Sequence, residues 1–349
     1  MHCPRSRRRF AGIAVSCLAF AAASLAGCKQ TVSDAAWPSR PIEISCFAAA
    51  GGGTDLIDRA LAGAMGQILG ASINVVNRTG GNGGVALNYV WSNPRDGYTW
   101  GGFSESIHPA PVMGAHHTTA KDWHWFMAAG APDVISVGPN SPYKSLDDLI
   151  ADAKARPGQV KAAASLSGSL HHAKLLALEK GAGVQFKMLP FKGSQPSNLA
   201  ILSGEADVVF TSISEQAELL KDKKLIPLAM AEMEPYEFPG LGTIPAAGAQ
   251  FPGLGELPVQ QWLGFALPID TPADILSKIT DAFVKAMESP EIKQLAADTF
   301  LTLYGYHGEE AGRRAAEMES AWCWTLYDLG IAQKSPEEFG IPRPDDGEQ

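Results

Sequence analysis

Four turns rich in glycine or serine constrain the fold of this chain more than any other feature of its sequence. They lie at residues 51–55, 165–172, 191–194 and 211–214, each after a short apolar run that suits a strand and before a segment that suits a helix. Strands that alternate with helices in this way predict an α/β fold with mainly parallel sheets. Open α/β sheets bind ligands at the carboxyl ends of their strands, so four such turns divided between two halves of the chain predict a cleft.

The order of the expected elements predicts two lobes within the 349 residues. Strands are expected at 42–48, 73–76, 98–103, 134–138, 160–164, 186–190, 207–210, 226–230 and 262–267, and helices at 54–69, 84–90, 146–155, 172–179, 195–202, 214–220 and from 272 onward. In the first helix, Leu56, Ala60, Met65 and Ile68 are expected to form the apolar face. Crossings near residues 138 and 232 would give lobe 1 residues 37–138 and 233–349, and lobe 2 residues 139–232.

The first 27 residues have the composition of an export signal. A basic head with four arginines precedes an apolar segment, residues 11–23, that is too short to span a membrane. The sequence Leu-Ala-Gly-Cys at 25–28 resembles a lipobox, in which cleavage leaves Cys28 as the lipidated first residue, followed here by a linker at 28–36. The expected location is the periplasm, with attachment to a membrane through the lipid. A soluble periplasmic protein is the alternative, and export by the Sec or the twin-arginine route stays open.

The charge and the cysteines of the remaining chain exclude several classes of partner. Loss of the export signal leaves 24 basic residues against 37 acidic ones, a balance that disfavours nucleic acid as a partner. Only Cys46 and Cys323 then remain in the folded body, too few for a zinc cluster, and no metal or cofactor is expected. Because Cys46 lies in an apolar run, a buried free thiol is expected there, while pairing of the two cysteines stays open.

The glycine-rich turn at 51–55 opens a helix, so it aims backbone N–H groups and the positive end of the helix dipole at whatever precedes it. Thr54 adds a hydroxyl, and Asp55 is expected to cap the helix. The turn lacks the Gly-Lys-Ser/Thr of a Walker loop and the spacing of a dinucleotide-binding loop. By itself it is as consistent with a structural tight turn as with an anion-binding site.

Two groups of histidines suggest chemistry that their spacing does not support. Ser169 and His172 would suit a serine hydrolase, but no G-x-S-x-G elbow surrounds them. The segment 116–125 contains three histidines and an aspartate, yet it matches no metal-ligand spacing. This segment is expected to be a loop, either solvated or packed around Trp123 and Trp125.

Several motifs follow one another along almost the whole chain after the export signal. They are W-P-S-R-P-I at 37–42, A-G-G-G-T-D at 50–55, N-R-T-G-G-N-G-G at 77–84, D-G-Y-T at 96–99, G-S-L-H-H at 168–172, F-K-G-S at 191–194, G-E-A-D at 204–207, and W-L-G-F-A-L-P at 262–268 with T-P at 271–272. In this order they resemble the solute-binding receptors of tripartite tricarboxylate transporters, often called Bug receptors. No single motif is decisive, but their order is specific.

The resemblance implies a two-lobed, type II (Venus-flytrap) periplasmic-binding-protein fold that closes, as a monomer and without catalysis, around a small carboxylate for delivery to membrane permease subunits. Backbone N–H and hydroxyl groups can hold a carboxylate without an arginine. Carried over by motif, the binding residues would be Ala48, Ala49, Gly51, Gly52, Gly53, Thr54, Phe103, Ser104 and Ser106 of lobe 1, and Ser167, Gly168, Ser169, His172, Lys192, Gly193, Ser194, Thr211 and Ser212 of lobe 2.

Two departures from the family pattern bear on specificity. Phe47-Ala48-Ala49 stands where the family usually has Pro-aromatic-Pro, so a roomier pocket for an aromatic or branched carboxylate is expected. Glu105 lies in an expected ligand turn, where it either points away or accepts from a ligand amine or hydroxyl. A serine hydrolase and a ligand sensor for a two-component system are the alternatives to a transport receptor.

Overall fold

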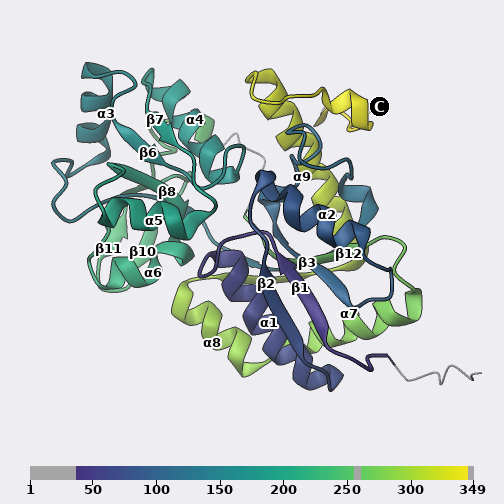
Figure 1. The fold of residues 1–349 in the computed structure, drawn as a ribbon. Coiled ribbons are helices and arrows are strands. Elements are labelled where there is room, and N and C mark those ends of the chain that lie inside the picture. Colours follow the sequence, from purple (N-terminus) through teal and green to yellow (C-terminus); the bar gives the residue numbers. More distant parts are fainter. Residues whose placement is uncertain (1–36, 255–260, 345–349) are drawn as a thin grey trace, which may run out of the picture. The chain divides into compact units, whose positions relative to one another are not determined.

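A computed structural model describes the chain from residue 37 to 254 and from 261 to 344. Within these residues, two β-sheets carry helices on both faces, which confirms the predicted α/β class (Figure 1). The predicted export signal, the lipidation site Cys28 and the linker all lie outside the described residues.

The larger sheet has six strands in the order β13-β4-β12-β3-β1-β2. Its strands are β1 (Ile42–Cys46), β2 (Ile73–Asn77), β3 (Thr99–Ser104), β4 (Trp123–Gly130), β12 (Leu263–Pro268) and β13 (Thr302–Tyr306). The pairs β1–β2 and β1–β3 are parallel, whereas β12 runs antiparallel to both β3 and β4, and β13 runs antiparallel to β4. A strand from late in the chain therefore separates two strands from its first half.

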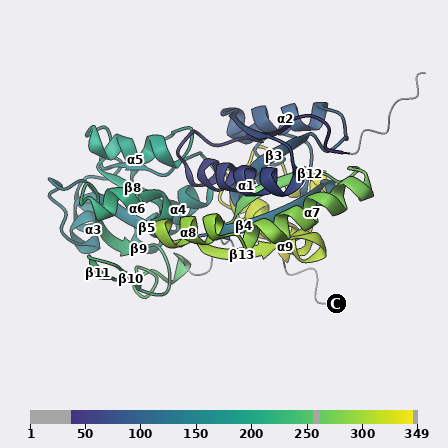
Figure 2. The ribbon, with the colours of Figure 1, turned by 90° about the horizontal axis from the view of Figure 1, so that it is seen from below.

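Helices cover both faces of this sheet because its strands are apolar on both sides. Two helices, α1 (Gly53–Leu69) and α7 (Ala273–Met287), pack side by side on one face, and α8 (Pro290–Thr299) lies against α1 and α7 (Figure 2). The opposite face packs against α2 (Gly84–Ser92) and α9 (Gly308–Asp328). Along β4 the side chains alternate between the two faces, as the period of a strand requires. Phe126 packs in the core beneath α1 and α7, and Trp125 and Met127 pack in the core beneath α2 and α9.

The apolar face predicted for α1 is rotated from the one observed. Of the four residues predicted for this face, Met65 is buried and Ala60 is half-buried against the same core, but Leu56 and Ile68 are 37% and 41% exposed. Ile57 and Leu61, which were not predicted, are buried. The helix buries the stripe that meets both the sheet and α7, and the position of α7 is set by a segment more than 200 residues later. Local sequence identified the helix but not its rotation about its own axis.

The smaller sheet has five strands in the order β7-β6-β8-β5-β9. These are β5 (Asp133–Val137), β6 (Lys161–Ala163), β7 (Lys187–Leu189), β8 (Val208–Ser212) and β9 (Ile226–Met230). Helices α3 (Leu146–Ala155) and α4 (Leu170–Ala182) share one core with this sheet, while α5 (Ser194–Leu202), α6 (Ile213–Lys221) and the hairpin β10 (Tyr236–Phe238) and β11 (Gly242–Ile244) share the other. The hairpin lies in a segment rich in proline and glycine, residues 235–254.

Both sheets are mixed, so the predicted mainly parallel pairing is only partly right. In the smaller sheet β6 pairs in parallel with β7 and β8, but β5 runs antiparallel to β8 and β9. The chain enters the smaller sheet through β5 and returns to the larger sheet through β12, and both of these strands run antiparallel to their neighbours. Because β5 belongs to the smaller sheet, the chain changes sheets between Gly130 and Asp133, before the boundary expected at residue 138.

Four of the described strands were not predicted: β10 and β11 of the hairpin, and β4 and β13 of the larger sheet. The segment 116–125, expected to be a loop, ends inside β4, which begins at Trp123. Of its two expected environments the structure shows aromatic packing, with ring centroids 5.6 Å apart for Trp123 and Phe103. The C-terminal region expected to be helical contains β13 between α8 and α9. Strand β4 is buried almost throughout, so its sequence lacks the alternation of polar and apolar residues that marks a half-exposed strand.

Cys46 and Cys323 are both free and buried, so the buried thiol expected at Cys46 is confirmed and the two cysteines do not form a disulfide. They lie in separate hydrophobic clusters. Across residues 37–254 and 261–344, none of the helices combines the length and the hydropathy that a membrane span requires.

Candidate ligand-binding site

A small cavity of about 20 Å³ lies where loops from the two sheets meet. Its walls come from the start of α1, the end of β3, the loop after β6 and the starts of α5 and α6. The lining residues are Phe47, Ala48, Gly52, Gly53, Thr54, Ser104, Glu105, Ser106, Ser165, Leu166, His171, Gly193, Ser194, Glu215, Gln261 and Leu263. This volume has room for about one water molecule.

Eight of the residues predicted to bind ligand line this cavity. They are Ala48, Gly52, Gly53, Thr54, Ser104, Ser106, Gly193 and Ser194. They come from both sheets, as a cleft between two lobes requires. The first turns of α1 and α5 thus bring their backbone N–H groups and dipoles to one small volume.

Other predicted residues lie at the rim or in the core. Gly51 and Lys192 are exposed, and Ala49 and Ser167 are partly exposed, with Ala49 next to Gly193. Phe103 is fully buried between Phe47 and Trp123, with ring centroids 6.3 and 5.6 Å away, and it does not line the cavity.

The remaining predicted residues hold the loops of the smaller sheet in place. Thr211 donates its hydroxyl proton to Asn198 Oδ1 at 2.9 Å, and Ser212 donates to Glu215 Oε2 at 2.9 Å. The carbonyl of Gly168 accepts from the indole N–H of Trp322 at 3.1 Å. These contacts stabilise the cavity wall from behind.

Ser169 and His172 do not form a nucleophile and base. The Ser169 hydroxyl donates to the carbonyl of Ala164 at 3.1 Å and accepts from the backbone N–H of His172 at 3.3 Å, so it caps α4. The His172 ring accepts from the N–H of Gly168 at 3.0 Å through Nδ1. A serine hydrolase needs the hydroxyl proton directed at the imidazole, and this geometry directs it elsewhere.

Asp55 does not occupy the N-cap position of α1, which belongs to Gly52. Its carboxylate, three residues later, accepts from the N–H of Gly51 at 2.9 Å and from the Asn77 side chain at 2.7 Å. These two bonds, together with an ion pair to Arg59, lower the pKa of Asp55 although burial opposes them. Asp55 therefore fixes the glycine turn from outside the cavity.

Glu105, which directly follows β3 of the larger sheet, places a carboxyl group at the cavity. Its side chain is buried, accepts from the Ser106 hydroxyl at 2.7 Å and accepts from the backbone N–H of Trp262 at 3.2 Å. Burial raises the pKa of Glu105 to about 7, although the cationic His171 acts in the opposite direction. The carboxyl group is thus shared between its two protonation states near neutral pH.

A buried charge cluster lies on the other side of the cavity. His171 Nδ1 is 2.7 Å from Asp133 Oδ2, and His171 Nε2 is 3.3 Å from Glu215 Oε2. Burial alone would lower the pKa of His171, but the two carboxylates raise it well above its usual value, so the ring is an imidazolium. Sequence reasoning did not select His171 or Glu215, although Glu215 completes a Ser-x-x-Glu capping box with Ser212 that could have been recognised.

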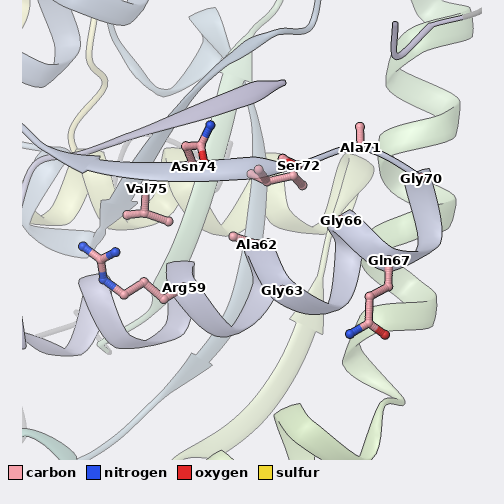
Figure 3. A pocket seen from close by; sticks show the side chains of 11 residues that line it. Arg59, Ala62, Gly63, Gly66, Gln67, Gly70, Ala71, Ser72, Asn74 and Val75 are labelled. Carbon is pink, nitrogen blue, oxygen red and sulfur yellow. The ribbon is translucent and has the colours of Figure 1, made fainter. Parts of the chain in front are cut away.

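A larger surface hollow lies elsewhere, between α1 and the edge strand β2 (Figure 3). Its volume is about 830 Å³, but small residues such as Ala62, Gly63 and Gly66 form much of its wall. Arg59 lies at one end and already pairs with Asp55. With few convergent polar groups, this open groove is a poorer candidate than the smaller cavity.

Among the described residues, no group of three or more His, Cys, Asp or Glu side chains is arranged to hold a metal ion.

Comparison with known proteins identifies the family of this chain. The family model described as tripartite tricarboxylate transporter family receptor matches residues 57–323. The UPF0065 protein in the gbd 5' region of Cupriavidus necator is 28% identical over 329 residues, which cover 94% of this chain and 99% of that protein. The structure of R. palustris Rpa4515 with adipate is 25% identical, with a TM-score of 0.76 and coverage of 85% and 99%. The structure of the periplasmic binding protein BugD is 19% identical, with a TM-score of 0.78 and coverage of 85% and 100%. The chain therefore belongs to the family of tripartite tricarboxylate transporter receptors.

Proposed function

We propose that this chain is an extracytoplasmic receptor that captures a small carboxylate in the cavity between its two sheets and delivers it to the membrane subunits of a tripartite transporter. One observation carries the proposal: the first turns of α1 and α5, from different sheets, line one cavity together with the hydroxyls of Thr54 and Ser194. Helix N-termini and hydroxyls are suitable donors for a carboxylate. The relative with adipate, whose chain this one covers almost completely, supports the same class of ligand.

Ligand entry requires the two sheets to separate at the cavity. A volume of about 20 Å³ is too small for a molecule with several carbon atoms. We assign the six-stranded sheet with its helices to lobe 1 and the five-stranded sheet with its helices to lobe 2. A ligand that contacts both lobes then stabilises the closed form by its differential affinity.

The same proposal includes the predicted attachment and location. Cleavage before Cys28 and lipidation of that residue would tether a periplasmic, monomeric receptor to a membrane, and the Leu-Ala-Gly-Cys sequence supports this. The receptor is proposed to have no catalytic activity. The Ser169 hydroxyl donates to the carbonyl of Ala164, and the His172 ring accepts from the N–H of Gly168, so neither group is arranged for catalysis. A role as sensor for a kinase would leave solute uptake intact in a strain that lacks the receptor, whereas the transport role predicts its loss.

The proposal is tested by calorimetry against a panel of mono- and dicarboxylates with two serine variants of α5. Ser194→Ala removes a cavity hydroxyl at the start of the helix and is expected to weaken binding at least tenfold. Ser203→Ala, just beyond the other end of α5, removes a hydroxyl bonded to the carbonyl of Ala200 and is the matched control, with less than a twofold effect. Equal effects of the two variants, or ester hydrolysis abolished by Ser169→Ala, would contradict the proposal.

A further inference from the structure

Two buried carboxyl groups, one from each sheet, line the cavity. Glu105 follows β3 and is 1% exposed, and the Glu215 side chain, in the first turn of α6, is 7% exposed. None of the described lining residues is a lysine or an arginine. Lys192, from the predicted ligand turn, is exposed, and Lys174 pairs with Glu232. Backbone N–H groups can hold one carboxylate without a cation, but no lysine or arginine of the described lining offsets these two carboxyl groups.

The cation that does line the cavity, His171, is already shared between two carboxylates. Its two ring nitrogens face Asp133 and Glu215 at 2.7 and 3.3 Å. One imidazolium opposite two carboxylates leaves an excess negative charge before Glu105 is counted. A second carboxylate on the ligand would therefore be placed among like charges in a site shielded from water, which is costly.

Donors and acceptors meet at opposite walls of the same small volume. A Cβ atom added to Gly53 would lie 3.1 Å from Glu215 Oε1, so the start of α1 faces this carboxylate directly. Glu105 Oε1 accepts from the Ser106 hydroxyl, and Ser106 also lines the cavity. Glu215 Oε2 already accepts from the backbone N–H and the hydroxyl of Ser212, so the remaining acceptor capacity of Glu215 lies at Oε1, the oxygen that faces Gly53. A carboxylate oxygen has more than one lone pair, so Glu105 can also accept another hydrogen bond. The cavity thus offers N–H donors at the starts of α1 and α5 and free acceptor capacity at Glu105 and Glu215.

We propose that the ligand is a monocarboxylate that also carries a hydrogen-bond-donating nitrogen, either a primary amide or an ammonium, which lies against Glu105 and Glu215. This inference rests on the proposed function, because it concerns the ligand of the same site. The carboxylate is held by the first turns of α1 and α5, while the nitrogen donates to the two buried carboxyl groups. A dicarboxylate of the same shape is discriminated against by the like charges it would bring to those groups.

The test compares ligands that share one carbon skeleton, by calorimetry at pH 7.5 on the purified full protein. One set is benzene-1,3-dicarboxylate, 3-carbamoylbenzoate and 3-(aminomethyl)benzoate, and the other is glutarate, its monoamide and 5-aminopentanoate. In at least one set a nitrogen-bearing ligand is expected to bind at least tenfold more tightly than the dicarboxylate. Dicarboxylates that bind as tightly or more tightly in both sets overturn the inference and leave the proposed function standing. Failure of every ligand, extended to a wider carboxylate panel, overturns the proposed function and the inference with it.

Glu105→Gln tests the residue directly because it replaces an acceptor with a group that can donate while keeping the size of the side chain. The variant is expected to reduce the preference for the nitrogen-bearing ligand at least tenfold, mainly by strengthening binding of the dicarboxylate. Glu319→Gln is the matched control: Glu319 is another buried carboxyl group, bonded to the N–H of Ala120 and outside this cavity, and its replacement should leave the preference unchanged. An unchanged preference in Glu105→Gln overturns the role of Glu105. The comparison of ligands on the unmodified protein decides the inference even if this variant does not fold.

Discussion

The buried carboxyl group of Glu319 makes the stability of the protein depend on pH in a way that one substitution can remove. Glu319 lies on α9, is 6% exposed and accepts from the backbone N–H of Ala120 at 2.8 Å. Burial raises the pKa of Glu319 to about 8, with a smaller contribution from Asp122 in the same direction. In the unfolded chain this group has the ordinary pKa of a glutamate, about 4.3.

The direction and size of the effect follow from proton linkage. Because the pKa is raised in the folded state, the unfolded state loses its proton first as the pH rises, and the folded state becomes less stable between about pH 4.5 and pH 8. A tenfold change in the dissociation constant corresponds to about 1.4 kcal/mol, so Glu319 lowers the free energy of unfolding by roughly 3 kcal/mol from pH 5 to pH 8. Glu319→Gln keeps a carbonyl acceptor for Ala120 and is neutral throughout this range.

The measurement is the free energy of unfolding in urea for both proteins at pH 5, 6.5 and 8. The free energy of unfolding of the variant, relative to that of the unmodified protein, is expected to rise by roughly 3 kcal/mol from pH 5 to pH 8. All other titrating groups are common to the two proteins and cancel in this difference. Two stability profiles that run parallel from pH 5 to pH 8 would refute the reasoning, because they would mean that the carboxyl group titrates alike in the folded and unfolded states.

Three further outcomes are expected. Ala48→Phe places a ring in the cavity wall and should weaken the best ligand at least tenfold in calorimetry, and unchanged affinity would rule out the roomier pocket. His171→Gln leaves two buried carboxylates without their cation and should lower the free energy of unfolding in urea by about 3 kcal/mol or more, whereas a loss below about 1 kcal/mol would show that the cluster is not held by charge. Cys46 and Cys323 should resist alkylation in the folded protein and both react in denaturant, as mass spectrometry would show; rapid labelling of either in the native state would contradict their burial.

Local signals predicted much of the smaller sheet and its helices. The helix predicted at residues 146–155 has the same bounds as α3, and the structure shows a capping box of Ser145 and Asp148 at its start. The strand at 226–230 likewise matches β9. Strand β4 was missed because its partners, β12 and β13, come from distant parts of the chain, and burial on both faces removed the alternation that would have marked it.

The candidate site was predicted through its turns rather than through its charges. The glycine and serine turns at the starts of α1 and α5 reach the cavity because strand ends gather at one edge of a sheet. His171 could not be distinguished from His172 in the sequence, because neighbouring residues on a helix point about 100° apart and the orientation of α4 depends on Asp133 in another strand. Glu215 reaches His171 only after the smaller sheet has formed.

The position of β12 between β3 and β4 sets an order of events in synthesis. When β4 has left the ribosome, the strand that must lie between it and β3 is still more than 100 residues away. Until then, the tryptophans and phenylalanine of β4 have no sheet partner, and an unpaired apolar strand is prone to associate with other chains. A fragment that ends before residue 262 therefore cannot complete the larger sheet, and the nascent chain depends on whatever holds it apart from its neighbours until its last third arrives.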